Sequence, residues 1–458
     1  MSKKIVILGA GITGLATAYR LEKDGYDVVV IEKNSEVGGA MQSVHENGFM
    51  IDYGPNSGLE TTPLIGKLVD ECGLRDKMIY ANQEGSKRYI LRDGKLHALP
   101  MTPATLLKTK LFSAKAKLRL LAEPFIGRSG EGYYQSISQF VCRRLGQEFL
   151  DYAINPFVAG VYAGNPDDLS VKSAFPKLYR LEEKYGGIFK GVIKGAKERK
   201  LNKEESKQSA KMFSFIDGMQ SFPKAVAAKL KGDIITNAEI AEVTKSGSCY
   251  LIRYTKEGEE QFLEAETIIS TLPAYSTCYL FKQTDPVLFN HLKTIYYPPV
   301  MVLYLVYKKE NIGHPLDGFG FLIPAKEKRT FLGAIWSSAI FKNRAPEGQE
   351  AFTIFIGGAR SPELFEMEKS DLIEKVLKEF QSVMRINGTP DFMADRIWKK
   401  AIPQYNIGYI EHEKYFEEFE KSHKGILLSG NYRGGIAVGD CIKNSEATYK
   451  RALSLMRD

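Results

Sequence analysis

A glycine-rich turn near the start of the chain restricts the fold more than any other feature of the sequence. The apolar run at 5–8 predicts a buried parallel strand, and the sequence GAGITG at 9–14 follows it directly. Apolar residues at 12, 15, 16 and 19 then share one face of a predicted helix, which Asp24-Gly25 ends. A second apolar strand at 28–31 is followed by Glu32. This order of strand, turn, helix and strand predicts an α/β fold built on parallel strands.

Each glycine of this turn has a separate role in holding a dinucleotide. Gly9 makes the tight turn, Gly11 lets the backbone approach a pyrophosphate, and Gly14 lets helix and strand pack closely. The pyrophosphate would then lie on free N–H groups at the positive end of the helix. Glu32 lies about 20 residues on, where an acidic side chain accepts hydrogen bonds from the adenosine ribose. The complete unit therefore predicts a dinucleotide site rather than a simple glycine-rich turn.

A second glycine cluster indicates which dinucleotide is bound. Val37-Gly38-Gly39 follows Glu32, and the pattern GxxxDxG spans 48–54. This sequel resembles the FAD-binding amine oxidase-like superfamily, in which the Gly-Gly loop passes close to the diphosphate and the flavin edge. The superfamily often has arginine next, whereas this chain has Ala40. The resemblance implies non-covalent FAD, held by Gly9, Gly11, Ile12, Thr13, Gly14, Glu32, Lys33, Gly38, Gly39, Ala40, Gly54, Pro55, Asn56, Ser57, Glu242, Val243, Thr271, Gly430, Asn431, Gly435, Ile436, Ala437 and Val438.

Length, charge and cysteine usage exclude several classes of protein. The 458 residues suffice for two or three domains, and the net charge of +8 is spread along the chain without a nucleic-acid-binding motif. Such a charge fits acidic ligands or an anionic membrane surface better than nucleic acid. The 5 scattered cysteines and 6 dispersed histidines predict buried thiols, no metal site and a reducing cytoplasm. The early first strand leaves no room for a signal peptide, and no apolar run reaches the roughly 18 residues of a membrane span.

The rest of the chain predicts a second sheet and a helical region. The Asp93-Gly94 turn predicts a hairpin within 87–99 that begins a new sheet. Residues 103–210 are predicted to be mostly helical, and a helix at 219–230 follows. The segment 425–440 predicts a last strand that leads into a helix N-terminus facing the flavin pyrimidine. Further strands are expected at 233–243, 249–255, 267–273, 296–307, 319–323, 331–338 and 351–357, with a further helix at 370–385.

These elements predict an α/β plus α fold with a discontinuous FAD-binding domain of the two-dinucleotide-binding type. Its expected parts are residues 1–80, 212–275 and 415–458. An inserted mixed-sheet substrate domain is expected at 81–102 and 276–414, and a helical subdomain at 103–211.

Two basic amphipathic stretches lie in the helical subdomain. Their cations are Lys108, Lys110, Lys115, Lys117 and Arg119 in the first, and Lys190, Lys194, Lys197, Arg199 and Lys200 in the second. One interpretation is a face that lies on anionic lipid, as a peripheral contact with the inner side of the cell membrane. The other is a solvated charged face, and the sequence leaves both open.

Segments beyond the flavin motif resemble the protoporphyrinogen oxidase family over essentially the full length. They include GPNS at 54–57, NPFVAGVYAGNP at 155–166, DGFGFLIP at 317–324, LGAI at 332–335, IGGA at 356–359, IPQY at 402–405 and the GNYxGG block at 430–435. The resemblance implies a six-electron oxidation of a porphyrinogen to a porphyrin in haem biosynthesis. Oxygen would reoxidise the FAD to give hydrogen peroxide, and a ferrochelatase would receive the product.

The resemblance also assigns substrate contacts by position. Arg88 matches an arginine that pairs with a substrate propionate, for which a planar guanidinium suits better than a lysine. Leu322, Ile335 and Phe355 match apolar positions that sandwich the macrocycle. Gly160, Ala163 and Gly164 match a loop near flavin and pyrroles. Without the resemblance, these residues would be a surface cation, core strand residues and a helix break.

This chemistry requires no acid or base from the protein. A porphyrinogen methylene between two pyrroles is already an activated hydride donor, so the site need only orient it and exclude water. Protoporphyrinogen IX carries two propionates and coproporphyrinogen III carries four. Relatives that prefer coproporphyrinogen often lack an arginine at position 88, which favours protoporphyrinogen, with coproporphyrinogen as the alternative.

Three other functions on this fold stay as remote alternatives. An amine oxidase needs an aromatic cage and often a lysine–water pair, neither of which can be assigned here. The porphyrinogen motifs also argue against a carotenoid desaturase. A non-catalytic dissociation inhibitor needs no flavin, whereas the phosphate loop and Glu32 are intact.

Overall fold

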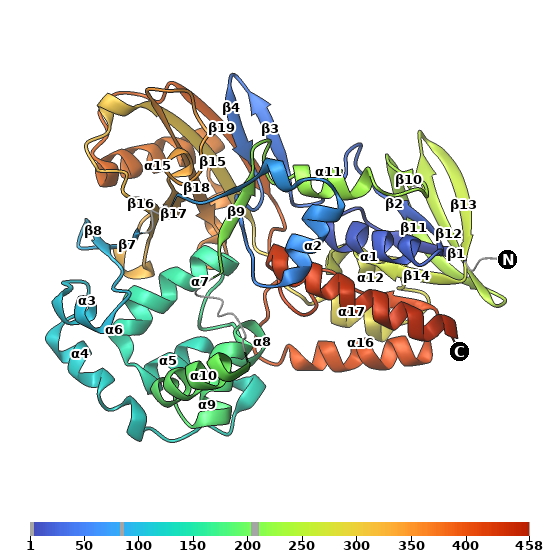
Figure 1. Ribbon diagram of the computed structural model, residues 1–458, viewed down its shortest axis with the longest axis horizontal. Coiled ribbons are helices and arrows are strands. Elements are labelled where there is room, and N and C mark those ends of the chain that lie inside the picture. The colour runs from blue at the N-terminus through green and yellow to red at the C-terminus, as the bar shows by residue number, and fades with distance from the viewer. Residues whose placement is uncertain (1–3, 83–86, 203–209, 458) are drawn as a thin grey trace.

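The computed structural model describes residues 4–82, 87–202 and 210–457, which form three groups of elements (Figure 1). One group contains a parallel sheet with the strand order β10-β2-β1-β14-β20. Its strands are β1 Lys4–Leu8, β2 Asp27–Ile31, β10 Ile234–Ile235, β14 Thr267–Ser270 and β20 Ile426–Leu428. The sheet thus joins segments from both ends and the middle of the chain, and both termini lie at the same side of the molecule (Figure 1).

Both faces of this sheet are covered, which explains why its strands are almost wholly apolar. One face packs against α1 Ile12–Lys23, α11 Ser221–Ala227 and α17 Val438–Arg457. The other face packs against a three-stranded antiparallel sheet and three helices. These are β11 Ala238–Ser246, β12 Cys249–Lys256, β13 Glu259–Ala265, α12 Ala274–Leu280, α13 Pro286–Lys293 and α16 Ile410–Ser422.

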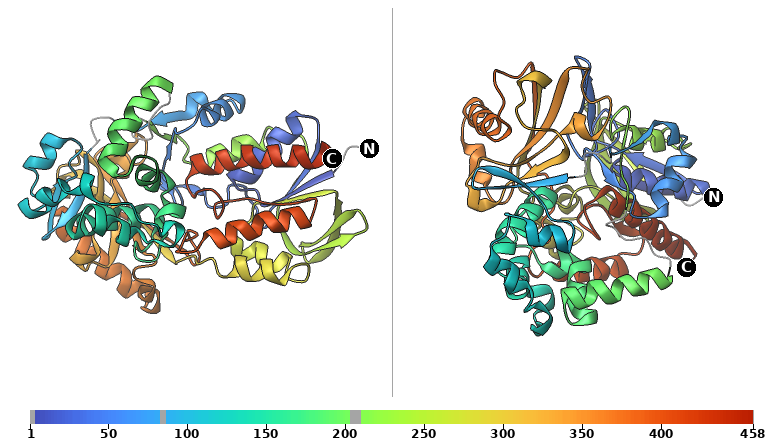
Figure 2. Two further views of the ribbon diagram at one scale, coloured as in Figure 1. Left: turned by 90° about the horizontal axis from the view of Figure 1, so that it is seen from below. Right: turned by 60° about the vertical axis from the view of Figure 1, so that its left-hand side comes forward.

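The second group is a seven-stranded sheet with the order β19-β15-β18-β17-β16-β7-β8. Its strands are β7 Lys87–Arg92, β8 Lys95–Ala98, β15 Val300–Lys308, β16 Gly318–Leu322, β17 Phe331–Ile335, β18 Gln349–Gly357 and β19 Phe392–Trp398. β7 and β16 pair in parallel and the other pairs are antiparallel. α15 Lys369–Met384 covers one face with an apolar stripe that includes Val376 and Phe380. The opposite face is therefore the one that turns toward the rest of the molecule (Figure 2).

The third group is helical and lies below the seven-stranded sheet in Figure 1. It contains α3 Pro103–Lys108, α4 Ala114–Leu120, α5 Ile137–Arg144, α6 Gln147–Phe149, η4 Leu150–Ile154, α7 Asn155–Tyr162, α8 Val171–Ala174, α9 Pro176–Tyr185 and α10 Ile188–Asn202. α7 lies next to β16 and β17, so it connects this group to the sheet.

The remaining elements join the groups. They are β3 Ser43–Glu46, β4 Phe49–Asp52, β5 Gly58–Leu59, α2 Pro63–Glu71, β6 Met78–Tyr80, β9 Met212–Phe215 and α14 Ser337–Ile340. β4 packs Phe49 and Ile51 against Val302 and Tyr304 of β15, so a segment between the flavin motifs lies on the seven-stranded sheet.

The structure has the mixture of parallel sheet, mixed sheet and helices that the sequence predicts. The predicted helix at 219–230 is wrong in its extent, because α11 covers only Ser221–Ala227. Gly218 has a φ of 82°, and the Met219 N–H donates to Asp52 rather than entering the helix. The division into three domains stays a prediction.

Candidate functional site

The turn between β1 and α1 has the geometry that a bound pyrophosphate requires. Gly9 has a φ of 99°, which favours glycine, and its N–H donates to Ile31 O at 2.8 Å. A Cβ on Gly14 would lie 2.2 Å from Gly9 O, whereas a Cβ on Gly11 would meet nothing within 4 Å. No side chain caps the first turn of α1. Its first N–H groups, which include those of Ile12 and Thr13, therefore lack a cap from the side chain of the preceding residue, as an anion site at a helix N-terminus requires.

Glu32 ends β2 beside this turn. Its Oε2 accepts a hydrogen bond from the Ala10 N–H at 2.8 Å, and its Oε1 accepts from the Asn34 backbone N–H at 3.0 Å. The Asn34 side-chain amide also donates to Oε1, at 2.7 Å, so the buried carboxylate is fixed and its Oε2 retains a lone pair for a further donor. Lys33 lies differently, because its ammonium pairs with Glu239 at 2.5 Å on the surface.

The segment around Glu242 and Val243 lies on β11, which begins where Ala238 N donates to Glu32 O. Val243 is a buried core residue, and Glu242 faces Arg253 at 3.3 Å. The contacts predicted for these two residues and for Lys33 stay predictions.

The Gly38-Gly39 loop lies directly on the phosphate turn. Gly38 donates its N–H to Ala10 O at 2.9 Å, and a Cβ on Gly39 would lie 3.4 Å from the Cα of Gly11. Gly54 packs so closely that its Cβ would be 1.8 Å from Ala40 O. Pro55, Asn56 and Ser57 follow and are half-buried. The Asn56 amide donates to the Thr353 hydroxyl at 3.3 Å, which brings the turn to β18 of the other sheet.

The glycine-rich block near the C-terminus completes the same region. The Thr271 hydroxyl lies 3.0 Å from both Leu8 O and Gly9 O, which holds the phosphate turn against β14. Gly430 and Gly435 have φ values of 123° and 125°. Tyr405 donates to Asn431 O at 2.7 Å and accepts from the Gly435 N–H at 2.9 Å.

Two helix N-termini meet at this point. The half-buried Ile436 and the exposed Ala437 lead into α17, which begins at Val438. Cys441 of α17 lies against Thr13 of α1, and burial raises the pKa of this thiol to about 11. The positive ends of both helices thus flank the predicted dinucleotide site.

The predicted substrate residues share one face of the seven-stranded sheet. Arg88 pairs with Gly320, which pairs with Ile335. These paired residues form one row across the sheet. Two residues further along β16 is a second row, in which Leu322 pairs with Gly333 and Gly333 pairs with Phe355. Because side chains alternate along a strand, these four lie opposite to the neighbours that face α15, such as Phe321. Leu322, Ile335 and Phe355 are half-buried, whereas Phe321 is 2% exposed, so they do not behave as ordinary core residues.

α7 lies against this face and ends in a strained turn. A Cβ on Gly160 would lie 2.6 Å from Leu322 Cδ2, so the helix touches the apolar row directly. Ala163 adopts a φ of 48° and accepts a hydrogen bond from the Ala359 N–H at 2.7 Å. A Cβ on Gly164 would lie 2.6 Å from Gln404 Oε1. The structure therefore brings the predicted loop and the predicted apolar residues together.

Arg88 lies at the edge of this face with its guanidinium 6.0 Å from the Phe319 ring centroid. The residue is exposed, and within residues 4–82, 87–202 and 210–457 it forms no ion pair. A cation in this state is free to bind an external anion.

Comparison with known proteins identifies the family. Residues 12–447 match the family described as flavin containing amine oxidoreductase. Protoporphyrinogen oxidase 2, chloroplastic/mitochondrial, of Arabidopsis thaliana is 34% identical over 469 residues, which cover 96% of this chain and 92% of the relative. Coproporphyrinogen III oxidase of Bacillus subtilis (strain 168) is 27% identical over 470 residues, which cover 99% of this chain and 98% of the relative. The chain belongs to the protoporphyrinogen oxidase family.

Membership of this family makes the chain an oxidoreductase with a flavin cofactor. A crystal structure from Exiguobacterium sp. 255-15 shares the fold, with a TM-score of 0.82 at 20% identity over 100% of both chains. The residues present fit the dinucleotide form of a flavin. The diphosphate needs space and hydrogen-bond donors, which the room beside Gly11 and the uncapped start of α1 supply. The ribose needs an acceptor, which the fixed carboxylate of Glu32 supplies.

One cation beside the substrate face, Arg360, is not among the site residues that the sequence predicts. Arg360 follows the Gly357-Gly358 turn and reaches the start of α7, where its Nη1 donates to Asn155 Oδ1 at 2.7 Å. Its Nη2 donates to Ile323 O at 3.2 Å. Loss of hydration lowers the pKa of this guanidinium to about 10. The sequence signal is that Arg360 directly follows IGGA at 356–359, one of the segments that carry the family resemblance.

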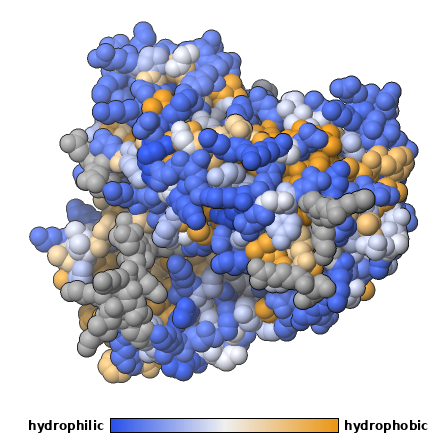
Figure 3. Space-filling model, turned by 45° about the vertical axis from the view of Figure 1, so that its right-hand side comes forward, coloured by the Kyte–Doolittle hydropathy of each residue, from blue (hydrophilic) through white to orange (hydrophobic). Residues whose placement is uncertain are grey.

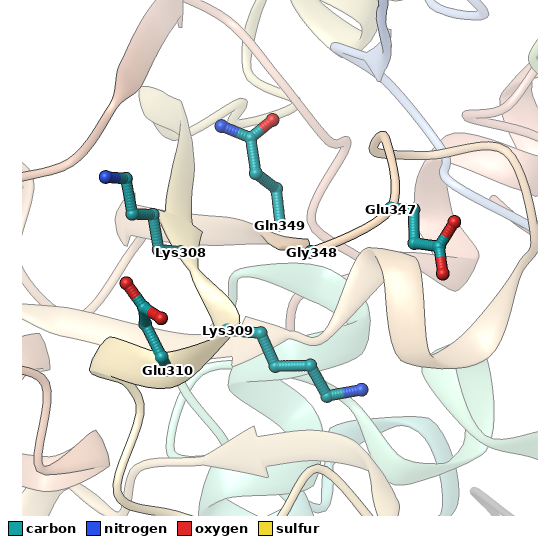
Figure 4. A pocket seen from close by; sticks show the side chains of 6 residues that line it. All are labelled: Lys308, Lys309, Glu310, Glu347, Gly348 and Gln349. Atoms are coloured by element: carbon teal, nitrogen blue, oxygen red, sulfur yellow. The ribbon is translucent and has the colours of Figure 1, made fainter.

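A surface depression at the far end of the same sheet lies apart from this site (Figure 4). It is lined by Lys308, Lys309, Glu310, Glu347, Gly348 and Gln349, and the five side chains splay apart. Val302 of β15 pairs with Phe355, and Lys308 is six positions further along the same strand. The depression is therefore about 20 Å from Phe355. Hydrophilic residues dominate the face shown in Figure 3, and hydrophobic ones gather in a few patches.

Proposed function

We propose that the protein catalyses the FAD-dependent, six-electron oxidation of a porphyrinogen to a porphyrin, with oxygen as acceptor and hydrogen peroxide as by-product. The observation that carries the proposal is the face that combines Leu322, Ile335 and Phe355 with Arg88, a cation without an ion pair in the described part of the chain. Asn56 connects this face to the dinucleotide turn through Thr353. A flat, largely apolar ring with carboxylate arms fits such a face. Relatives named as oxidases of two different porphyrinogens support the same substrate class.

The residues of the chain have positioning roles in this proposal. A bound flavin supplies the electron acceptor. Leu322, Ile335 and Phe355 cover the faces of the macrocycle and exclude water, while Gly160 lets α7 pack directly against Leu322. Arg88 binds one propionate and so fixes the rotation of the ring in its plane. No general base is needed, because the methylene between two pyrroles is already activated.

Protoporphyrinogen IX is the first substrate that we propose, because Arg88 provides the single strong carboxylate contact that its propionate edge needs. Coproporphyrinogen III is the alternative. The porphyrin product would pass to a ferrochelatase-type enzyme that inserts iron.

Two measurements test the proposal: the activity of the wild-type protein and that of the variant Arg88→Met. We expect the purified protein to consume about three oxygen molecules per protoporphyrin formed, because each oxygen accepts two of the six electrons. Arg88→Met should raise the KM by about 10- to 100-fold, since a hydrogen bond to a charged group contributes roughly 1.5–3 kcal/mol. Arg88→Lys should recover part of the loss, because it keeps the charge without the planar fork.

The measurement is porphyrin fluorescence with parallel oxygen uptake. Lys87→Gln serves as the neighbouring control, because Lys87 is paired with Asp317 at 2.5 Å. Failure of the wild-type protein to oxidise either porphyrinogen would refute the proposal.

We further propose that the helical group rests on an anionic membrane at the inner face of the cell. Its surface carries large apolar side chains, with exposed fractions of 71% for Met101, 72% for Leu107, 69% for Leu121 and 88% for Phe125. Lys108, Lys110, Lys115, Lys190 and Lys194 are exposed in the same group. The side chains of Lys197, Arg199 and Lys200 lie outside the described residues. No helix within the described ranges is long and apolar enough to cross a membrane.

Removing two of these apolar side chains should weaken binding to vesicles. Leu121→Ser with Phe125→Ser should reduce partitioning onto phosphatidylglycerol vesicles by at least about tenfold, since each buried side chain contributes roughly 1.5–3 kcal/mol. Phe262→Ser is the matched control, because Phe262 is 57% exposed on β13, in the group around the parallel sheet. Equal binding of the double variant and the wild type in a flotation assay would show that this surface is only solvated.

A further inference from the structure

Arg360 is a partly buried cation whose protein partners are all neutral. Its guanidinium donates to the amide oxygen of Asn155 and to the carbonyl of Ile323. These bonds use two of its five N–H donors. Within the described ranges no carboxylate lies within ion-pair distance of it, and the loss of hydration that lowers its pKa is offset by no neighbouring negative charge.

Other buried arginines of this chain, unlike Arg360, have a carboxylate as partner. Arg144 faces Glu123 at 2.8 Å, and Arg344 faces Asp52 at 3.3 Å. A charge removed from water is costly unless an opposite charge or a full set of hydrogen bonds compensates it. The uncompensated state of Arg360 therefore indicates that its anion comes from outside the chain.

The position of Arg360 relates it to the substrate face. The Ala359 N–H donates to Ala163 O at the end of α7, and the Arg360 side chain then reaches Asn155 at the start of that helix. The guanidinium thus lies along α7 at Ile323, directly after Leu322 of the apolar row. Since Arg88 is level with Gly320, Ile323 lies three residues, or about 10 Å, further along β16.

Arg88 and Arg360 therefore lie at two separated places around the same apolar face. Ile335 shares the row of Arg88, and Leu322 and Phe355 occupy the row between that one and Arg360. A ring that covers these three side chains would have its rim near both cations.

We propose that Arg360 forms a second carboxylate subsite, which lets the enzyme accept a tetracarboxylate porphyrinogen in addition to a dicarboxylate one. This inference rests on the proposed oxidation of porphyrinogens. Protoporphyrinogen IX has its two propionates on neighbouring pyrroles, so a molecule held by Arg88 presents vinyl and methyl groups to the remote rim. Coproporphyrinogen III has a propionate on every pyrrole and presents a carboxylate there. Arg360 is thus a specificity-determining residue for the larger anion.

The experiment compares wild type, Arg360→Met and Arg360→Lys on both porphyrinogens. We expect Arg360→Met to lower the ratio of kcat/KM for coproporphyrinogen III over that for protoporphyrinogen IX by about tenfold or more, chiefly through KM. Arg360→Lys should restore part of the ratio. Lys378→Gln is the control, because Lys378 pairs with Glu374 on α15, which covers the opposite face.

A binding measurement separates this role from a structural one and does not depend on turnover. Fluorescence titration should show that Arg360→Met weakens binding of coproporphyrin III about tenfold but leaves its uncharged tetramethyl ester unaffected. An unchanged ratio with parallel losses for both substrates, or equal weakening for acid and ester, would overturn the subsite and leave Arg360 as a tether for α7. An inactive wild type that still binds coproporphyrin III through Arg360 would refute the proposed function alone.

Discussion

Replacing Gly11 with valine should abolish flavin binding and leave the apoprotein folded. The backbone of Gly11 has a φ of −73° and a ψ of 171°, an extended conformation that valine adopts without strain. A Cβ there would meet no protein atom within 4 Å, so the variant can fold without the clash that a side chain at Gly14 would cause. It would occupy the space in which we place the pyrophosphate. We expect the flavin absorbance at saturating FAD to fall below about a tenth of the wild-type value, because no conformer of valine vacates that space.

The control variants make this result specific. Gly130→Val also places a side chain in open space, on the surface of the helical group, and should keep full flavin content. Gly14→Val should fail to fold, because its Cβ would lie 2.2 Å from Gly9 O. Adding FAD should raise the Tm of wild type and of Gly130→Val but not that of Gly11→Val, since only a bound ligand stabilises the folded state. Full flavin content in Gly11→Val would place the cofactor elsewhere.

The parts of the fold that the sequence predicted are those with strong local signals. Gly9 and the Asp93-Gly94 turn adopt the positive φ values that their residue types favour, 99° at Gly9 and 51° and 70° in the turn. Gly14 allows the close packing predicted for it. The strands missed include β13 and β19, which lie at sheet edges. An edge strand buries little, so β13 contains mostly exposed polar residues and lacks a clear alternation. α16 was also missed, since Phe416 and Phe419 are its only fully buried residues.

The site was less predictable because it is assembled by tertiary contacts. Asn56 and Thr353 are 297 residues apart, and no local pattern announces their hydrogen bond. Lys33 stands next to Glu32, yet it points to the surface and pairs with Glu239. Arg360 looks like a loop cation in the sequence, because the loss of its hydration depends on α7 and on the end of β16. Strand register, which sequence does not give, is what aligns Arg88 with Ile335.

Replacing Arg144 with methionine should destabilise the protein by about 3–5 kcal/mol through the helical group. Arg144 is fully buried and donates to Glu182 and, at 2.8 Å, to Glu123, both of which are 1% exposed or less. It also donates to Gly127 O and Gly186 O, so one guanidinium connects the segments around α5, α9 and α10. Methionine fills most of the volume but leaves two buried carboxylates without their shared cation.

The effect should depend on pH in a defined direction. Burial alone would raise the pKa of Glu182, but the Ser129 N–H, Arg144 and Arg143 outweigh it and hold that pKa below its ordinary value. In the wild type this carboxylate therefore stabilises the fold above its unfolded pKa, and that contribution is lost as the pH falls through the folded pKa. Without Arg144, Glu182 loses one of the groups that lower its pKa, so that pKa rises and less stability depends on the charged form of the carboxylate. The difference between wild type and variant should shrink from pH 8 to pH 5.

Urea unfolding followed by circular dichroism at both pH values measures this difference. Arg143→Met is the matched control, because Arg143 contacts the same Glu182 at 2.8 Å but its side chain is 27% exposed. A partly solvated pair contributes about 1 kcal/mol or less, so this variant should be much closer to wild type. Similar losses in both variants, or a difference for Arg144→Met that grows toward pH 5, would show that hydrophobic packing rather than this buried charge cluster holds the segments around α5, α9 and α10 together.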